Sequence, residues 1–100
     1  MDGQTTSQVD LTLLRLISKA RRLHDRLLQG DGTTIATLAR TEGVTGSYLT
    51  RLLRLTFLSP KIVTAIVEGR QPAGLSATRL MQLRSVPLDW HEQYQLLGLV

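Results

Sequence analysis

The amino-acid sequence predicts an all-α protein, a small bundle of about six helices that contains a helix-turn-helix. Twenty of its 100 residues are leucine, whereas Phe, Trp and Tyr together number four. A core of this composition suits packed helices better than a β-sandwich, which favours β-branched and aromatic side chains. Capping residues and Gly or Pro breaks recur along the chain and divide it into short helices within one domain of residues 10–100.

The first helix is expected over residues 11–29, after a disordered tail of residues 1–9. Asp10 provides its N-cap and Gly30 its end. Apolar side chains recur at the spacing of one helix face: Leu13, Leu16, Ile17, Ala20, Leu23, Leu27 and Leu28. Another face carries a basic stripe: Arg15, Lys19, Arg22 and Arg26. A solvated helix surface and contact with phosphates are equal alternatives for this stripe.

Two shorter helices are expected after a turn at residues 30–32. Thr33 or Thr34 caps the first of them, which covers residues 35–41. Residues 42–44 then end this helix, because glycine is a common residue at a helix C-terminus. Thr45 caps the next helix, which is expected over residues 46–57.

The C-terminal part is expected to contain three further helices. Ser59 caps a helix over residues 60–68, with proline at its first position and Gly69 at its end. Because Ile62, Val63, Ile66 and Val67 are β-branched, a strand is the competing prediction, but the flanking signals favour a helix. Ser76 caps a helix that reaches about residue 83, and the last helix is expected over residues 88–97.

Residues 35–54 have the spacing of a helix-turn-helix. Ala39 lies where the two helices cross, and only a small side chain lets their backbones approach. Gly43 follows four residues later, in the turn, where a positive φ favours glycine. The inward positions are filled by apolar side chains: Leu38, Val44, Leu49 and Leu52. An αα-corner that merely packs is the alternative to a DNA-binding motif.

The outward face of the second motif helix favours DNA binding over packing alone. It carries no acidic residue and six small or basic ones: Thr45, Gly46, Ser47, Thr50, Arg51 and Arg54. Short side chains at the helix start let the backbone lie deep in a major groove, and the N-terminal N–H groups suit a phosphate. Arg51 and Arg54 can reach guanine O6 and N7, or else a phosphate. We therefore predict sequence-specific binding of double-stranded DNA through this face.

Three further residues at or beside this face are considered one by one: Tyr48, Arg40 and Gly46. Tyr48 either donates its hydroxyl to a phosphate while its ring rests on the first motif helix, or is a half-buried packing residue. Arg40 either touches a backbone phosphate or is a solvated surface arginine. Gly46 in the first helical turn costs up to ~1 kcal/mol relative to alanine, and close approach to DNA is its expected benefit.

The run LARTEGVTGSYLTRLLRL, residues 38–55, resembles the helix-turn-helix of ParB/KorB-type partition proteins. In that family a similar segment is followed by a helix that begins near a proline, as residues 58–63 do here. The longer string through GRQPAGL at residues 69–75, and then residues 87–93, is similar to a C-terminal DNA-binding module of some bacterial and phage serine site-specific recombinases. The resemblance covers roughly residues 10–98.

The resemblance implies a helical bundle with its second motif helix in the major groove, in a transcription regulator or a partition- or recombination-associated protein. It also implies that later helices help to contact DNA or partners. Arg70 and Gln71 are the candidates for this contact, and a solvated turn is the alternative for both. Because 100 residues leave no room for a recombinase catalytic domain, we expect a stand-alone module or a fragment.

Several other functions are excluded by composition. The chain has no cysteine, so it has no disulfide, thiol nucleophile or cysteine-based zinc site. His24 and His91 are too few for an ordinary zinc site, and the carboxylates are scattered. The turn at residues 30–32 lacks the preceding strand and the lysine of a phosphate-binding loop. We expect no enzymatic activity, no cofactor and no small-molecule substrate.

Charge and hydropathy indicate the partner and the compartment. All twelve basic residues lie between Arg15 and Arg84, where four acidic ones leave a net charge of +8, and both flanks are acidic. An arginine-rich basic domain suggests a polyanionic partner, most often nucleic acid. No apolar run approaches the ~18–20 residues of a membrane span, and the N-terminus is polar. We expect a cytoplasmic, nucleoid-associated protein that does not contact a membrane.

A helical protein–protein interaction module that does not bind DNA is the rival function. Its surface would use the apolar residues near the C-terminus: Trp90, Tyr94, Leu97, Leu99 and Val100. The alternative is that these residues close the core of the bundle. A homodimer also remains open, because many helix-turn-helix proteins bind palindromic sites as two-fold dimers.

Overall fold

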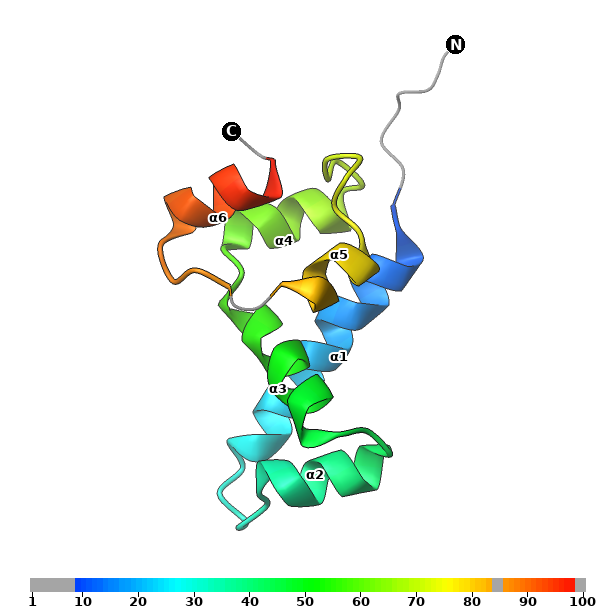
Figure 1. Cartoon of the computed structure of the whole chain (residues 1–100), viewed down its shortest axis with the longest axis vertical. Helices are drawn as coiled ribbons and strands as arrows, with labels where there is room; N and C mark the ends of the chain where they lie inside the picture. Colours follow the sequence, from blue (N-terminus) through cyan, green and yellow to red (C-terminus); the bar gives the residue numbers. More distant parts are fainter. Residues whose placement is uncertain (1–8, 84–85, 99–100) are drawn as a thin grey trace.

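The computed structural model describes residues 9–83 and 86–98, and within these ranges it contains helices and no strand. The elements, in chain order, are α1 (Leu11–Leu27), α2 (Ile35–Glu42), α3 (Gly46–Arg54), the 3₁₀ turn η1 (Leu55–Phe57), α4 (Pro60–Val67), α5 (Ala77–Gln82) and α6 (Trp90–Leu97) (Figure 1). The predicted all-α bundle of six helices is confirmed. The predicted tail lies outside the described residues except for Val9.

Every one of these α-helices begins at a side chain that caps it. The cap oxygen accepts a hydrogen bond from the backbone N–H three residues further on, which satisfies one of the unpaired donors at the helix start. The caps are Asp10, Thr34, Thr45, Ser59, Ser76 and Asp89. Five of them are the predicted ones, with Thr34 rather than Thr33 before α2. Asp89 was expected inside the last helix, which begins two residues later than predicted because Asp89 caps it.

Helix ends differ from the predictions where the chain has to change direction. The helix expected over residues 46–57 is α-helical only as far as Arg54 and continues as the 3₁₀ turn η1 from Leu55. The change occurs here because Leu58 is extended and leads into the cap of α4. A 3₁₀ turn is a common way to end an α-helix. α1 ends at Leu27, and the following Leu28 is 70% exposed. Leu28 was therefore wrongly assigned to the buried face.

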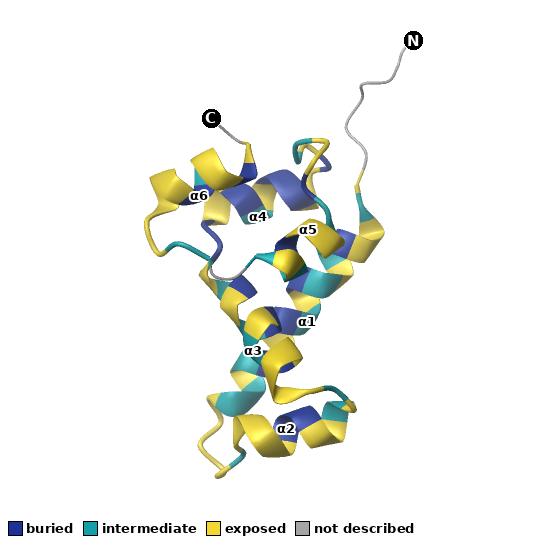
Figure 2. Cartoon of the chain, viewed as in Figure 1, coloured by how far each residue is buried: buried dark blue, intermediate teal, exposed yellow. Residues whose placement is uncertain are grey.

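The core forms around α1, which contacts α3, η1, α4 and α5. The buried face of α1 consists of Leu13, Ile17, Ala20 and Leu23. Figure 1 shows α2 at one end of the molecule and α4 and α6 at the other, with α1 running between them. In Figure 2 the buried residues lie on the inner faces of the helices, and most of α2 and α6 is exposed. Leucine dominates this core, as its abundance predicts.

A buried glutamine attaches α6 to the rest of the bundle. Gln93 is 0% exposed. Its Oε1 accepts from the Ser59 N–H at 2.8 Å, and its Nε2 donates to the carbonyls of Phe57 and Pro87 at 2.9 and 2.6 Å. No pattern in the sequence marks Gln93 for this role.

The apolar face predicted for the last helix is only partly buried. Leu97 is 7% exposed and belongs to the core, and Tyr94 packs against it. Trp90, in the first turn of α6, is 53% exposed. Leu99 and Val100 lie outside the described residues. Part of the predicted face therefore closes the bundle, and Trp90 faces solvent.

Candidate nucleic-acid interface

The turn between α2 and α3 is held by glycine in the left-handed conformation. Gly43 has φ 72°, a value that L side chains adopt only with strain. Its N–H donates to the Arg40 carbonyl at 3.2 Å, and the N–H of Val44 donates to the Ala39 carbonyl at 3.0 Å. These bonds satisfy carbonyls at the end of α2 and turn the chain sharply into the cap of α3.

The inward positions predicted for this helix pair lie against the core. Ala39 is 4% exposed, and a small side chain at this position lets the neighbouring helices approach. Leu38, Leu49 and Leu52 are buried as well, and Val44 is partly buried against them. The local geometry of residues 35–54 therefore agrees with the predicted spacing.

The outward face of α3 lies open to solvent. Thr45, Gly46, Ser47, Arg51 and Arg54 are exposed, and Thr50 is half-buried. Together with Ile35 and Ala36 at the start of α2, five of these residues line a hollow of about 730 Å³: Gly46, Ser47, Thr50, Arg51 and Arg54. None of the residues that line it is acidic. An anionic ligand would therefore meet no carboxylate in this hollow.

Hydrogen bonds within α3 define what its two threonine hydroxyls can offer a ligand. The Thr45 oxygen accepts from the Tyr48 N–H at 3.0 Å, so its own hydrogen remains available to a ligand acceptor. The Thr50 hydroxyl instead donates to the Gly46 carbonyl at 2.9 Å. While that bond lasts, Thr50 offers only its oxygen lone pairs, and it would accept a hydrogen bond from a base.

Tyr48 lies at the edge of this face. Its side chain is 38% exposed and lines a separate groove with residues of α1 and α5, none of which belongs to α2. The structure places Tyr48 beside α1 and α5, and neither of its two predicted roles is tested by this arrangement, so both stay predictions. Tyr48 is a half-exposed side chain whose hydroxyl can reach a ligand in that groove.

The remaining residues predicted to contact DNA lie in α2 and in the loop after α4. Arg40 is exposed in the last turn of α2. Arg70 forms an ion pair with Glu68, and its Nε donates to Glu68 Oε1 at 2.8 Å. This loop after α4 lies at the opposite end of the molecule from α2 (Figure 1), and Gln71 within it is half-buried. The structure does not bring Arg70 and Gln71 to the outward face of α3.

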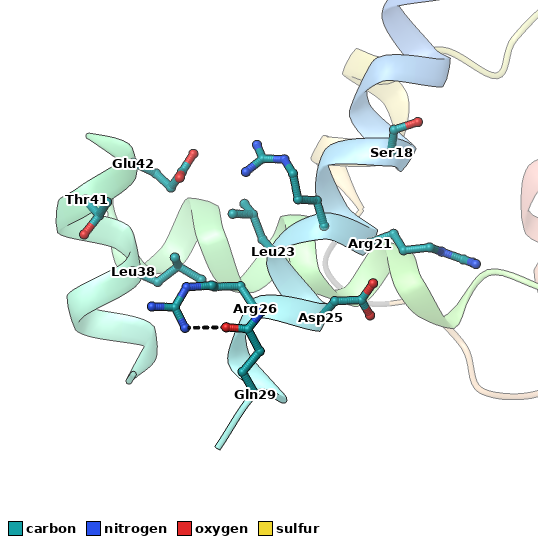
Figure 3. A pocket seen from close by; sticks show the side chains of 10 residues that line it. Ser18, Arg21, Leu23, Asp25, Arg26, Gln29, Leu38, Thr41 and Glu42 are labelled. Carbon is teal, nitrogen blue, oxygen red and sulfur yellow. Dashed lines mark hydrogen bonds between the residues drawn. The ribbon is translucent and has the colours of Figure 1, made fainter. Parts of the chain in front are cut away.

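The basic stripe on α1 is divided between two surfaces. Arg22 and Arg26 line a hollow of about 640 Å³ against α2, together with two acidic residues, Asp25 and Glu42. Figure 3 shows the Glu42 side chain turned toward this hollow and Arg26 bonded to Gln29 at 3.2 Å. Arg26 also forms a salt bridge with Asp31 at 2.6 Å. This half of the stripe has carboxylates beside it.

Asp31 organises the turn between α1 and α2. Its Oδ1 accepts from the hydroxyl and the N–H of Thr33 at 2.7 and 3.1 Å. These bonds, with that from Arg26, lower the pKa of Asp31 to about 2 from its ordinary 3.8. Because the folded-state pKa is depressed, the carboxylate contributes stability above about pH 4, and this contribution is lost as the pH falls toward 2.

We expect an NMR titration to find the midpoint of Asp31 near 2. Arg26→Gln and Thr33→Val should each raise this midpoint, because each removes a hydrogen bond to the ionised carboxylate. A midpoint near 3.8 in the unmodified protein would show that the turn is open in solution.

Comparisons of the chain with protein-family models, with curated proteins and with solved structures find no match. Within residues 9–83 and 86–98, no three side chains of the metal-binding types come together. Over the same ranges, every helix is too short or too polar to cross a lipid bilayer. A function can therefore be inferred only from the surfaces of the molecule.

Proposed function

We propose that this protein binds double-stranded DNA in a sequence-specific manner, with α3 in the major groove. One observation carries the proposal: the exposed face of α3 combines hydroxyl and arginine side chains without any acidic residue. The major groove admits an α-helix, and its base edges offer a distinct pattern of donors and acceptors at each base pair. A helix that starts with Gly46 and Ser47 can approach those edges closely because its first side chains are short.

The proposed face divides into base-reading and backbone-binding residues. Arg51 and Arg54 supply the forked donors that pair best with guanine O6 and N7, and Thr45, Ser47 and Thr50 offer hydroxyls to other edges. Arg40, exposed in the last turn of α2, is placed by this proposal at a backbone phosphate. Phosphate contacts hold the protein in register, and base contacts give specificity.

Selection from a random duplex pool, followed by a mobility shift on the selected sequence, tests the proposal. We expect enrichment of one sequence and tighter binding of that sequence than of random duplex at moderate salt. Equal affinity for the selected sequence and for random duplex would show that the protein does not read the base sequence and is held only by attraction to phosphates. A palindromic selected site would indicate a homodimer and would suit a regulator or a recombination-associated module.

Gly46→Ala separates a DNA-contacting role from a purely structural one. A Cβ at this position would meet no atom within 4 Å, and Gly46 does not need a positive φ. We expect the free energy of unfolding to rise by up to about 1 kcal/mol, because alanine favours the helix. Binding of the selected duplex should nevertheless weaken by about fivefold or more, corresponding to ~1 kcal/mol of lost base contact.

Gly74→Ala is the matched control for this experiment. Gly74 also has open space around the position of a Cβ and lies in the loop before α5. Its substitution should leave DNA affinity unchanged. If Gly46→Ala stabilises the protein and binds the selected duplex as tightly as before, the backbone of α3 does not approach DNA at this position.

A protein–protein interaction module is the second candidate function, and the exposed apolar residues near α6 favour it. Leu88 is 76% exposed and Trp90 is 53% exposed. Large side chains of this kind are enriched in partner interfaces. The absence of any duplex binding at low salt would favour this function over the first one.

A further inference from the structure

A groove of about 490 Å³ is lined by residues of α1 and α5 together with Tyr48 of α3. Arg15 and Lys19 of α1 stand one helical turn apart along it, and Thr78 and Gln82 of α5 are spaced in the same way. Residues four apart share a helix face, so two rows of polar side chains border the groove. Leu16, Ala77 and Met81 provide its apolar surface.

The polar side chains of this groove are donors, and none is acidic. Arginine, lysine, tyrosine, threonine and glutamine side chains all donate hydrogen bonds, and they are the side chains that proteins use on DNA phosphates. The hollow between α1 and α2 differs in this respect, since Asp25 and Glu42 line it. The two halves of the basic stripe therefore face different chemical surroundings, and only the half at Arg15 and Lys19 lacks carboxylates.

The groove adjoins the outward face of α3. Tyr48 lines the groove, and Arg51, one helical turn further along α3, lines the hollow on the outward face. On the other side of that hollow lies the start of α2, with Ile35 and Ala36. A helix in the major groove has a sugar–phosphate backbone on each side of it, because the groove is only ~12 Å wide. The groove between α1 and α5 is thus beside the position that one DNA strand would occupy.

We infer that this groove holds the sugar–phosphate backbone of one DNA strand, which makes α5 a DNA-contacting element. The inference rests on the proposed function and extends it to residues outside α2 and α3. Arg15 and Lys19 neutralise consecutive phosphates, while Tyr48, Thr78 and Gln82 donate hydrogen bonds to phosphate oxygens. Leu16 and Met81 pack against the deoxyribose, the apolar part of the backbone. The occupant is the strand of the bound duplex and not a separate ligand.

The double variant Arg15→Gln/Lys19→Gln tests this inference against a control of equal charge. Each phosphate contact contributes about 0.9 to the slope of log K against log salt, so the double variant should lower the slope by about two. The selected duplex and random duplex should lose affinity by the same factor, because phosphates carry no sequence information.

Arg21→Gln/Arg79→Gln is the control double variant. It removes the same total charge, one arginine from α1 and one from α5, but Arg21 and Arg79 line other hollows, beside Asp25 and beside Gln95 respectively. Its salt slope should stay within about half a unit of the unmodified protein. If the two double variants change the slope equally, only the net charge matters and the inference is overturned.

Hydrogen exchange on the bound complex gives a readout that does not depend on charge. The backbone amides of α5 should exchange more slowly when the selected duplex is bound, whereas those of α6 should not change. Unchanged exchange in α5, with protection confined to α2 and α3, would overturn the inference and leave the proposed function intact. If the unmodified protein binds no duplex at all, the proposed function and this inference fail together.

Discussion

Arg51→Ala is expected to weaken binding of the selected duplex by about 5- to 150-fold, corresponding to ~1–3 kcal/mol. Arg51 is exposed on α3 and lines the hollow that contains no acidic residue. A bidentate contact to guanine O6 and N7 is the strongest contact that an arginine makes with a base edge. Its loss should relax specificity at one base pair, so duplexes altered at that pair should bind the variant almost as well as the selected duplex does.

The measurement is a mobility shift on the selected duplex and on single-base variants of it, at two salt concentrations. A phosphate contact gives a different result, with all sequences weakened alike and the salt slope reduced by about one. Arg70→Ala is the control, since Arg70 is paired with Glu68 and lies in the loop after α4. Tight binding by Arg51→Ala, with full discrimination at every base pair, would exclude Arg51 from base readout.

The starts of five of the six described α-helices could be predicted from the sequence because the signals are local. A cap joins a side chain to an N–H three residues away, so Ser59 followed by proline, or Thr45 before a glycine, is sufficient evidence by itself. The turn at Gly43 was predictable for the same reason, since its positive φ is a property of one residue. The outward face of α3 then followed from the helical period once the inward residues were known.

The surroundings of the helices could not be predicted, because they depend on residues far apart in the chain. Tyr48 was expected either to rest on α2 or to be a half-buried packing residue. Its place beside α1 and α5 could not be predicted, because no local pattern specifies where those two helices pass. The division of the basic stripe could not be predicted for the same reason. It depends on α2, which places Glu42 beside Arg22 and Arg26, and on α5, which borders the groove that contains Arg15 and Lys19. The helical period identifies the basic face of α1, but it does not show which residues of other helices lie beside that face.

The role of Gln93 could not be predicted from the sequence for a related reason. Glutamine is usually exposed, and a glutamine in a short helix of mixed polarity has no feature that marks it as buried. Its main partner, the N–H of Ser59, is 34 residues away. A capping rule finds contacts between residues three apart, whereas a contact across 34 residues is found only when the fold is known.

Gln93→Leu is expected to lower the free energy of unfolding by about 2–4 kcal/mol. The substitution keeps a side chain of similar size, so the loss comes from hydrogen bonds and not from a cavity. It leaves the Ser59 N–H, which lies in a fully buried residue, without an acceptor. The carbonyls of Phe57 and Pro87 lose their donor as well, although neither residue is fully buried. An unsatisfied buried group costs ~1–3 kcal/mol, and most of the effect should come from Ser59.

Thermal and urea unfolding measure this effect, and we expect the Tm to fall by roughly 10–25 °C. Gln95→Leu, on the exposed side of the same helix, is the matched control and should stay within about 0.5 kcal/mol of the unmodified protein. The folded fraction of Gln93→Leu should still bind the selected duplex, because Gln93 lies on α6 and the proposed DNA contacts lie on α1, α2, α3 and α5. If Gln93→Leu unfolds at the same temperature as Gln95→Leu, apolar contacts such as those of Leu97 attach α6 without help from Gln93.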